Sequence, residues 1–194
     1  MTGLRWACRG ARPVAAALLL ASCAGPPLTL YTLGTPGLAL DAAPLGRRAV
    51  VIEVARVSLP DALDTEDILV RHGSVLRRSE QGRWASRLSA GITRLLVARL
   101  AQRRPDALVT AQPQTEAPAY RVLVNISRLD VTAEGTAALE ADWQVVPRDP
   151  ALPPRRDRGA FSATGAVATD RDVVALEGAV LDQLAARIGD AGLR

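Results

Sequence analysis

The residues best suited to chemistry in this sequence are two cysteines, Cys8 and Cys23, and a single histidine, His72. A thiol or an imidazole can act as a nucleophile, a general base or a metal ligand, but each role needs partners of matching chemistry. No serine or cysteine stands in a nucleophile-elbow motif, and His72 precedes Gly73 in a predicted tight turn. We therefore expect a non-enzymatic protein with no catalytic residue, no metal site and no cofactor.

A cluster of acidic residues between Asp61 and Asp67, in "PDALDTED", is the other candidate for chemistry, as a calcium site. Its spacing lacks the central glycine and the terminal glutamate of a calcium-binding loop. The cluster is better explained as a solvated loop between two strands.

Cys23 closes a segment with the features of a secretory signal peptide. Arg5, Arg9 and Arg12 precede an apolar run over residues 14–20, and small residues follow it. The run is far shorter than the roughly 20 residues that a membrane-spanning helix requires. Residues 1–22 are therefore predicted to be removed.

The last four residues of this segment, Leu20-Ala21-Ser22-Cys23, match the bacterial lipobox. The match predicts cleavage between Ser22 and Cys23, a diacylglycerol on the thiol of Cys23 and an acyl chain on its new amino group. Several acyl chains anchor a protein stably where one does not. Two alternatives stay open, an ordinary signal peptide cut nearby and a buried cysteine in a hydrophobic helix.

The charge of the chain excludes one class of partner. It contains 24 arginines and no lysine against 20 acidic residues, a formal net charge of +4. Loss of the signal peptide removes three arginines, which leaves 21 basic and 20 acidic residues. With no arginine-rich stripe interleaved with aromatic residues, we expect no binding to nucleic acid.

Hydrophobic periodicity predicts one domain behind a tether. Residues 23–46 are rich in proline and glycine and are predicted to be a flexible tether, and residues 47–194 a single domain. Strand patterns cover residues 49–60, 67–80 (a hairpin turning at His72-Gly73), 119–131, 137–146 and 155–167, and helical patterns cover residues 83–104 and 169–189. This order predicts an α+β two-layer domain, a largely antiparallel sheet with two amphipathic helices packed on one face.

Two tryptophans fall inside the predicted domain. Trp84 opens the first helical pattern, and Trp143 lies on the apolar face of a predicted strand. Both are expected to be structural anchors of the core, although either could instead line a surface that binds a partner.

Several short motifs follow one another along the chain: the lipobox, then "YTL" (31–33), "SLP" (58–60), "ILVR" (68–71), "RWAS" (83–86) and "LEADWQV" (139–145). In this order they resemble the PqiC-like family of ABC-type transport auxiliary lipoproteins. Arg71 and Trp84 match family motifs, and their role in the family pattern is structural.

The resemblance implies an outer-membrane lipoprotein, lipid-anchored on the periplasmic face, that serves as a docking component for an MCE-domain protein. That partner belongs to an ABC-type transporter that moves lipid between the two membranes. The resemblance further implies a homo-oligomeric ring and contact with phospholipid. A different class of function stays open, an outer-membrane or LPS-assembly lipoprotein that pairs with a β-barrel.

Overall fold

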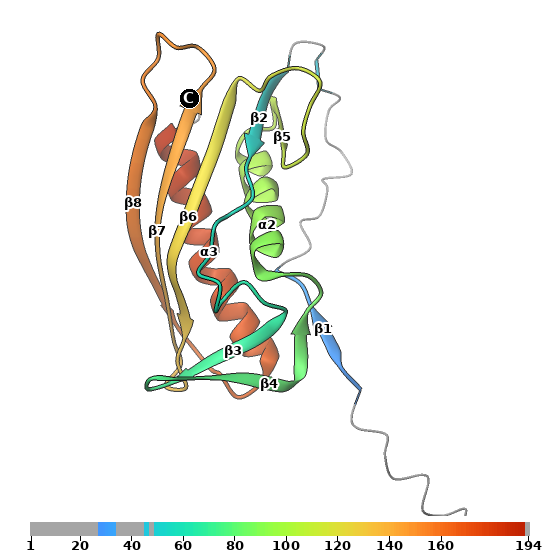
Figure 1. Cartoon of the computed structure of the whole chain (residues 1–194), viewed down its shortest axis with the longest axis vertical. Helices are drawn as coiled ribbons and strands as arrows, with labels where there is room; N and C mark the ends of the chain where they lie inside the picture. The colour runs from blue at the N-terminus through green and yellow to red at the C-terminus, as the bar shows by residue number, and fades with distance from the viewer. Residues whose placement is uncertain (1–26, 34–44, 47–48, 193–194) are drawn as a thin grey trace, which may run out of the picture.

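The computed structural model describes residues 27–33, 45–46 and 49–192 (Figure 1). In chain order its elements are β1 (Thr29–Tyr31), β2 (Val50–Val54), β3 (Asp67–His72), β4 (Val75–Trp84), α2 (Leu88–Arg103), β5 (Ala107–Thr110), β6 (Tyr120–Val131), β7 (Thr136–Pro147), β8 (Arg155–Thr164) and α3 (Asp170–Gly192).

The larger sheet has five strands in the order β5-β2-β6-β7-β8. Strands β6, β7 and β8 form an antiparallel meander, and Gly135 makes its first turn at a φ of 83°. That conformation is one that side-chain-bearing residues rarely adopt. Both helices pack against this sheet, with α3 contacting β7 and β8 and α2 contacting β5 and β2 (Figure 1). The predicted α+β class is confirmed.

Strand β2 departs from the expected antiparallel pairing, because it runs parallel to both of its neighbours, β5 and β6. Parallel strands need a crossover connection, and α2 supplies it between β2 and β5. Strand β5 lies in a four-residue stretch, "ALVT", too short for a strand pattern to stand out in the sequence.

A second sheet, in the order β1-β4-β3, covers one end of the domain (Figure 1). Strands β3 and β4 form the predicted hairpin, with Gly73 at a φ of 61° in its turn. Strand β1 runs parallel to β4, and Leu33 just beyond it is buried. Residues 29–33 fall within the predicted flexible tether, so this part of the tether is packed onto the domain, because Tyr31 and Leu33 are apolar and face the core.

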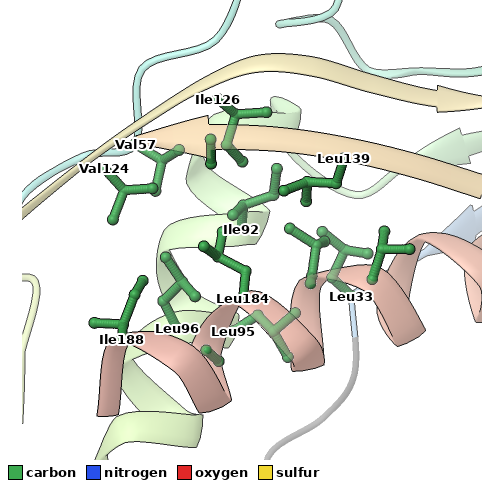
Figure 2. Packing of buried hydrophobic residues seen from close by; sticks show 14 of the residues in the cluster. Leu33, Val57, Ile92, Leu95, Leu96, Val124, Ile126, Leu139, Leu184 and Ile188 are labelled. Carbon is green, nitrogen blue, oxygen red and sulfur yellow. The ribbon is translucent and has the colours of Figure 1, made fainter. Parts of the chain in front are cut away.

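The core lies between the five-stranded sheet and the two helices (Figure 2). Ile92 on α2, Leu184 on α3 and Ile126 on β6 are fully buried there. On β6, β7 and the two helices, the apolar positions on the inner side are buried: Leu88, Ile92, Leu95, Leu96, Leu100, Val122, Val124, Ile126, Leu139, Ala141, Trp143, Val145, Val173, Leu176, Val180, Leu184 and Ile188. On β8 the alternation is weaker, and Phe161 and Ala163 are only half-buried.

The two helices begin in different ways. Helix α3 begins with a local capping contact, in which the backbone N–H of Asp172 donates to Thr169 Oγ1 (3.3 Å) and that of Thr169 donates to Asp172 Oδ2 (2.9 Å). Helix α2 begins at Leu88, so the expectation that Trp84 opens it is wrong: Trp84 is the last residue of β4. Asp64, distant in sequence, accepts the hydrogen bond from the Ser89 N–H (3.0 Å).

Helix α3 also runs past Gly189, its predicted end, to Gly192. Gly189 lies against α2, since a Cβ placed on it would be 2.7 Å from Cδ of Arg103. The glycine therefore allows the two helices to approach and does not end the helix.

Candidate functional site

The predicted lipidation residue Cys23 and the cleavage position Ser22 lie outside the described residues, so lipidation and cleavage remain predictions. The described part of the chain starts at Pro27, close behind Cys23 in sequence. In sequence, Cys23 precedes β1 by six residues, and β1 belongs to the three-stranded sheet at one end of the domain (Figure 1).

Arg71 joins the β3–β4 hairpin to the end of β6. Its Nε and Nη2 atoms donate to Asp130 Oδ1, at 2.8 and 2.6 Å, and its backbone carbonyl accepts from the Ala133 N–H at 3.0 Å. Arg128 Nε donates to the second oxygen, Asp130 Oδ2, at 2.9 Å. The Arg71 side chain thus holds the two sheets together, which is a structural role.

Asp130 stays charged in this setting even though it is nearly buried. Burial by itself would raise the pKa of its carboxyl, but the hydrogen bonds from Arg71 and Arg128 outweigh that effect and lower the pKa below its ordinary value. The carboxylate is therefore an anchor for two guanidinium groups and not a proton donor.

Trp84 lies beside a group that the sequence analysis missed, Glu177 on α3. Both line a small cavity of about 10 Å³, and Trp84 Nε1 and Glu177 Oε2 are each buried without a hydrogen-bond partner among the described residues. A cavity of this size has room for about one water molecule. Burial raises the pKa of Glu177 to about 8, so its carboxyl is protonated at neutral pH.

The sequence does contain a signal for Glu177. It stands four residues after Val173 and four before Leu181, both of which are buried on the inner face of α3. Positions four apart share a helix face, so an acidic residue there had to enter the core. The prediction of an amphipathic helix over residues 169–189 considered only its apolar residues and did not include Glu177.

Trp143 lies apart from this cavity, on the core face of β7. It is 3% exposed, and its ring packs against Phe161 of β8 with the centroids 6.5 Å apart and the planes tilted by 31°. Such tilted aromatic pairs are favourable beyond their buried area. Trp84 lines the small cavity together with Asp130, and Arg71 is paired with Asp130, so these two residues lie in one region. Trp143 does not line this cavity.

A wider hollow is at the other end of the domain from β1. It has a volume of about 600 Å³ and is lined by the starts of β2 and β6 and by the segment after β7, including Val50, Tyr120 and Leu152. Leu152 is 49% exposed. Arg148 stabilises its rim, because its N–H donates to the Ala119 carbonyl at 2.8 Å. The hollow is a shallow depression, open to solvent, with a partly apolar lining.

The remaining chemical candidates do not converge. His72 is exposed in the hairpin turn, and Asp67 pairs with Arg83. Across residues 27–33, 45–46 and 49–192, no three histidine, cysteine or acidic side chains are placed to hold a metal ion. Within those same ranges, no helix combines the length and the apolar character that crossing a membrane requires.

The structure defines a small α+β domain in which two helices pack against a five-stranded sheet. Residues 31–189 match the family described as ABC-type transport auxiliary lipoprotein component, and the chain belongs to that family. The resemblance drawn from the sequence motifs is thereby confirmed. The family is an auxiliary component of transport and is not a known enzyme family.

Two solved structures share the fold. A crystal structure of an uncharacterized protein has 17% sequence identity and a TM-score of 0.69, covering 85% of this chain and 98% of that one. A DUF330 protein from Xanthomonas campestris has 15% identity and a TM-score of 0.59, covering 82% and 92%. No curated protein matches the sequence.

Proposed function

We propose that this protein is a lipid-anchored, non-enzymatic docking component of an ABC-type transporter that moves lipid between the inner and outer membranes. Cys23 carries the lipid anchor, the domain lies on the periplasmic face of the outer membrane, and its partner is the MCE-domain subunit of the transporter. Several copies form a ring around the tip of that subunit.

The observation that carries this proposal is the family match over residues 31–189, which begins directly behind a lipobox ending at Cys23. The family match supports the role in transport, and the lipobox supports attachment to a membrane. Arg71, Arg83 and Asp130 are each engaged in ion pairs within the domain, so we assign them a structural role and not one in the docking contact.

The two ends of the domain suit two different contacts. Strand β1, next to the anchor, lies at one end of the long axis, and the loops that follow β5 and β7 lie at the other (Figure 1). The hollow of about 600 Å³ is formed at that second end. A domain anchored through Cys23 would present this hollow to the periplasm, where the transporter subunit approaches. We place the docking contact there.

Replacing Cys23 with alanine should abolish acylation and release the domain from the membrane, because no other thiol of the sequence follows a lipobox. Metabolic labelling with an alkyne fatty acid and the mass of the product measure acylation. Flotation of envelopes measures release from the membrane. Cys8→Ala is the matched control and should leave labelling unchanged. Undiminished labelling of the Cys23→Ala protein would refute the lipobox assignment.

The lipidated protein in detergent should capture the MCE-domain protein encoded beside it. Leu152→Arg should weaken this capture at least about 10-fold, since a charge would have to be buried in the docking contact. Val75→Arg is the control, because Val75 is similarly exposed (54%) but is the first residue of β4, beside the hairpin turn at the opposite end. Equal capture by both variants would contradict the position of the contact, and capture of a β-barrel instead would favour the alternative function.

A further inference from the structure

Strand β1 and the residue before it carry exposed leucines on the outer side. Tyr31 is half-buried and Leu33 is buried, so alternate residues point into the domain, whereas Leu28 and Leu30 point away from it. Leu28 is 61% exposed and Leu30 is 66% exposed, more than any other large hydrophobic side chain among the described residues. A strand with only one face on the core normally carries polar residues on its other face. The exposed leucines therefore indicate that something covers the outer face of β1.

The charged residue that lies next to Leu30 on β4 is already paired. Leu30 aligns with Arg83 on β4, and the Nε of Arg83 pairs with Asp67 Oδ1 at 3.1 Å. The same guanidinium donates to the backbone carbonyls of Ser79 and Gly82, at 2.5 and 2.7 Å. The cation next in register to Leu30 is therefore already neutralised and hydrogen-bonded, which lowers the cost of covering this face with an apolar medium.

The predicted anchor keeps this face close to the bilayer. Leu28 follows Cys23 by five residues, and an extended chain spans at most about 3.5 Å per residue, or about 18 Å in all. The headgroup layer of one leaflet is itself roughly 5–8 Å thick. Strand β1 is paired with β4, and Leu33 lies in the core, so the anchor is coupled to the body of the domain.

We propose that the outer face of β1, formed by Leu28 and Leu30, is a second membrane contact that rests in the headgroup–acyl boundary of the bilayer in which Cys23 is anchored. The proposal rests on the lipid anchor of the proposed function. A second copy of the chain is the competing occupant, but it gives no reason for the exposed leucines to lie beside the anchor. The contact fixes the domain upright, with the hollow behind β7 turned away from the membrane.

The test uses the lipidated protein in vesicles of phosphatidylethanolamine and phosphatidylglycerol, with a fluorescent NBD group on Leu30→Cys. Acylated Cys23 offers no competing thiol. Leu28→Cys is a second reporting position, and Leu152→Cys at the far end is the matched control. Nitroxide-bearing lipids should quench the probe at positions 28 and 30 at least about threefold more than at 152, whereas aqueous iodide should quench it most at 152.

Quenching by iodide and not by nitroxide lipid at positions 28 and 30 would overturn the contact. Protection from both quenchers would also overturn it, in favour of a second copy. Flotation and acyl labelling of the same samples separate this failure from a failure of the proposed function. If the protein floats with the vesicles but iodide reaches positions 28 and 30, only the second contact is refuted. If the protein does not float with the vesicles, the anchor and the contact are refuted together.

Discussion

Replacing Trp143 with alanine should lower the free energy of unfolding by about 3–5 kcal/mol, the usual cost of removing a large aromatic side chain from a packed core. The residue is almost fully buried and pairs with Phe161 across β7 and β8. The change would leave a cavity beneath the meander and remove the ring contact. Urea unfolding followed by far-ultraviolet circular dichroism measures the loss.

Trp143→Phe is the control, because it keeps an aromatic ring at this position and should recover most of the lost stability. The pair also decides between the two roles considered for this tryptophan. If Trp143→Ala left stability within about 1 kcal/mol of the original while capture of the partner failed, Trp143 would belong to a binding surface and not to the core.

Glu177 should make the protein less stable as the pH rises from about 4.5 to about 8. In this window the unfolded chain has lost the proton of this carboxyl, whereas the folded chain keeps it, since burial raises the pKa from 4.5 to about 8. The folded state therefore binds more protons, and stability falls by about 1.4 kcal/mol per pH unit. Over the full window the loss approaches roughly 5 kcal/mol, and it levels off at higher pH.

Glu177→Gln isolates this effect, because glutamine has nearly the same shape and no proton to lose. Urea unfolding at pH 5, 6, 7 and 8 should give a midpoint that falls with pH for the original protein relative to the variant. The two proteins should be closest at pH 5. Parallel midpoints across this range would show that Glu177 ionises freely in the folded protein and would contradict the burial argument. Asp67 and Asp130, which line the same cavity, are paired with arginines in both proteins.

The elements that sequence reasoning predicted best are those whose signals are local. The meander alternates residue by residue, and α3 carries both an apolar stripe and its own capping residues, Thr169 and Asp172. Each of these features depends on neighbours within a few positions. The lipobox is equally local, which is why Cys23 could be named from the sequence.

The features that were missed depend on residues far apart. The cap of α2 comes from Asp64, so no nearby residue marked the true start of the helix at Leu88. A glycine such as Gly189 is typical of a helix end. In the structure it lies inside α3, where a Cβ would come too close to the Arg103 side chain of α2. The parallel pairing of β2 is likewise invisible until β5 and β6 are placed on either side of it.

The same pairing of β2 bears on how the protein is made. A chain is synthesised from its N-terminal end, yet Ile52 of β2 aligns with Tyr120 of β6, and β3, β4, α2 and β5 lie between them in sequence. The apolar segment "VVIEV" therefore emerges with both edges unpaired, before either of its partner strands has been made. Unpaired strands of this kind invite pairing with other chains. Closing the sheet is thus a late step of biogenesis, at which the emerging chain is most exposed to aggregation and proteolysis.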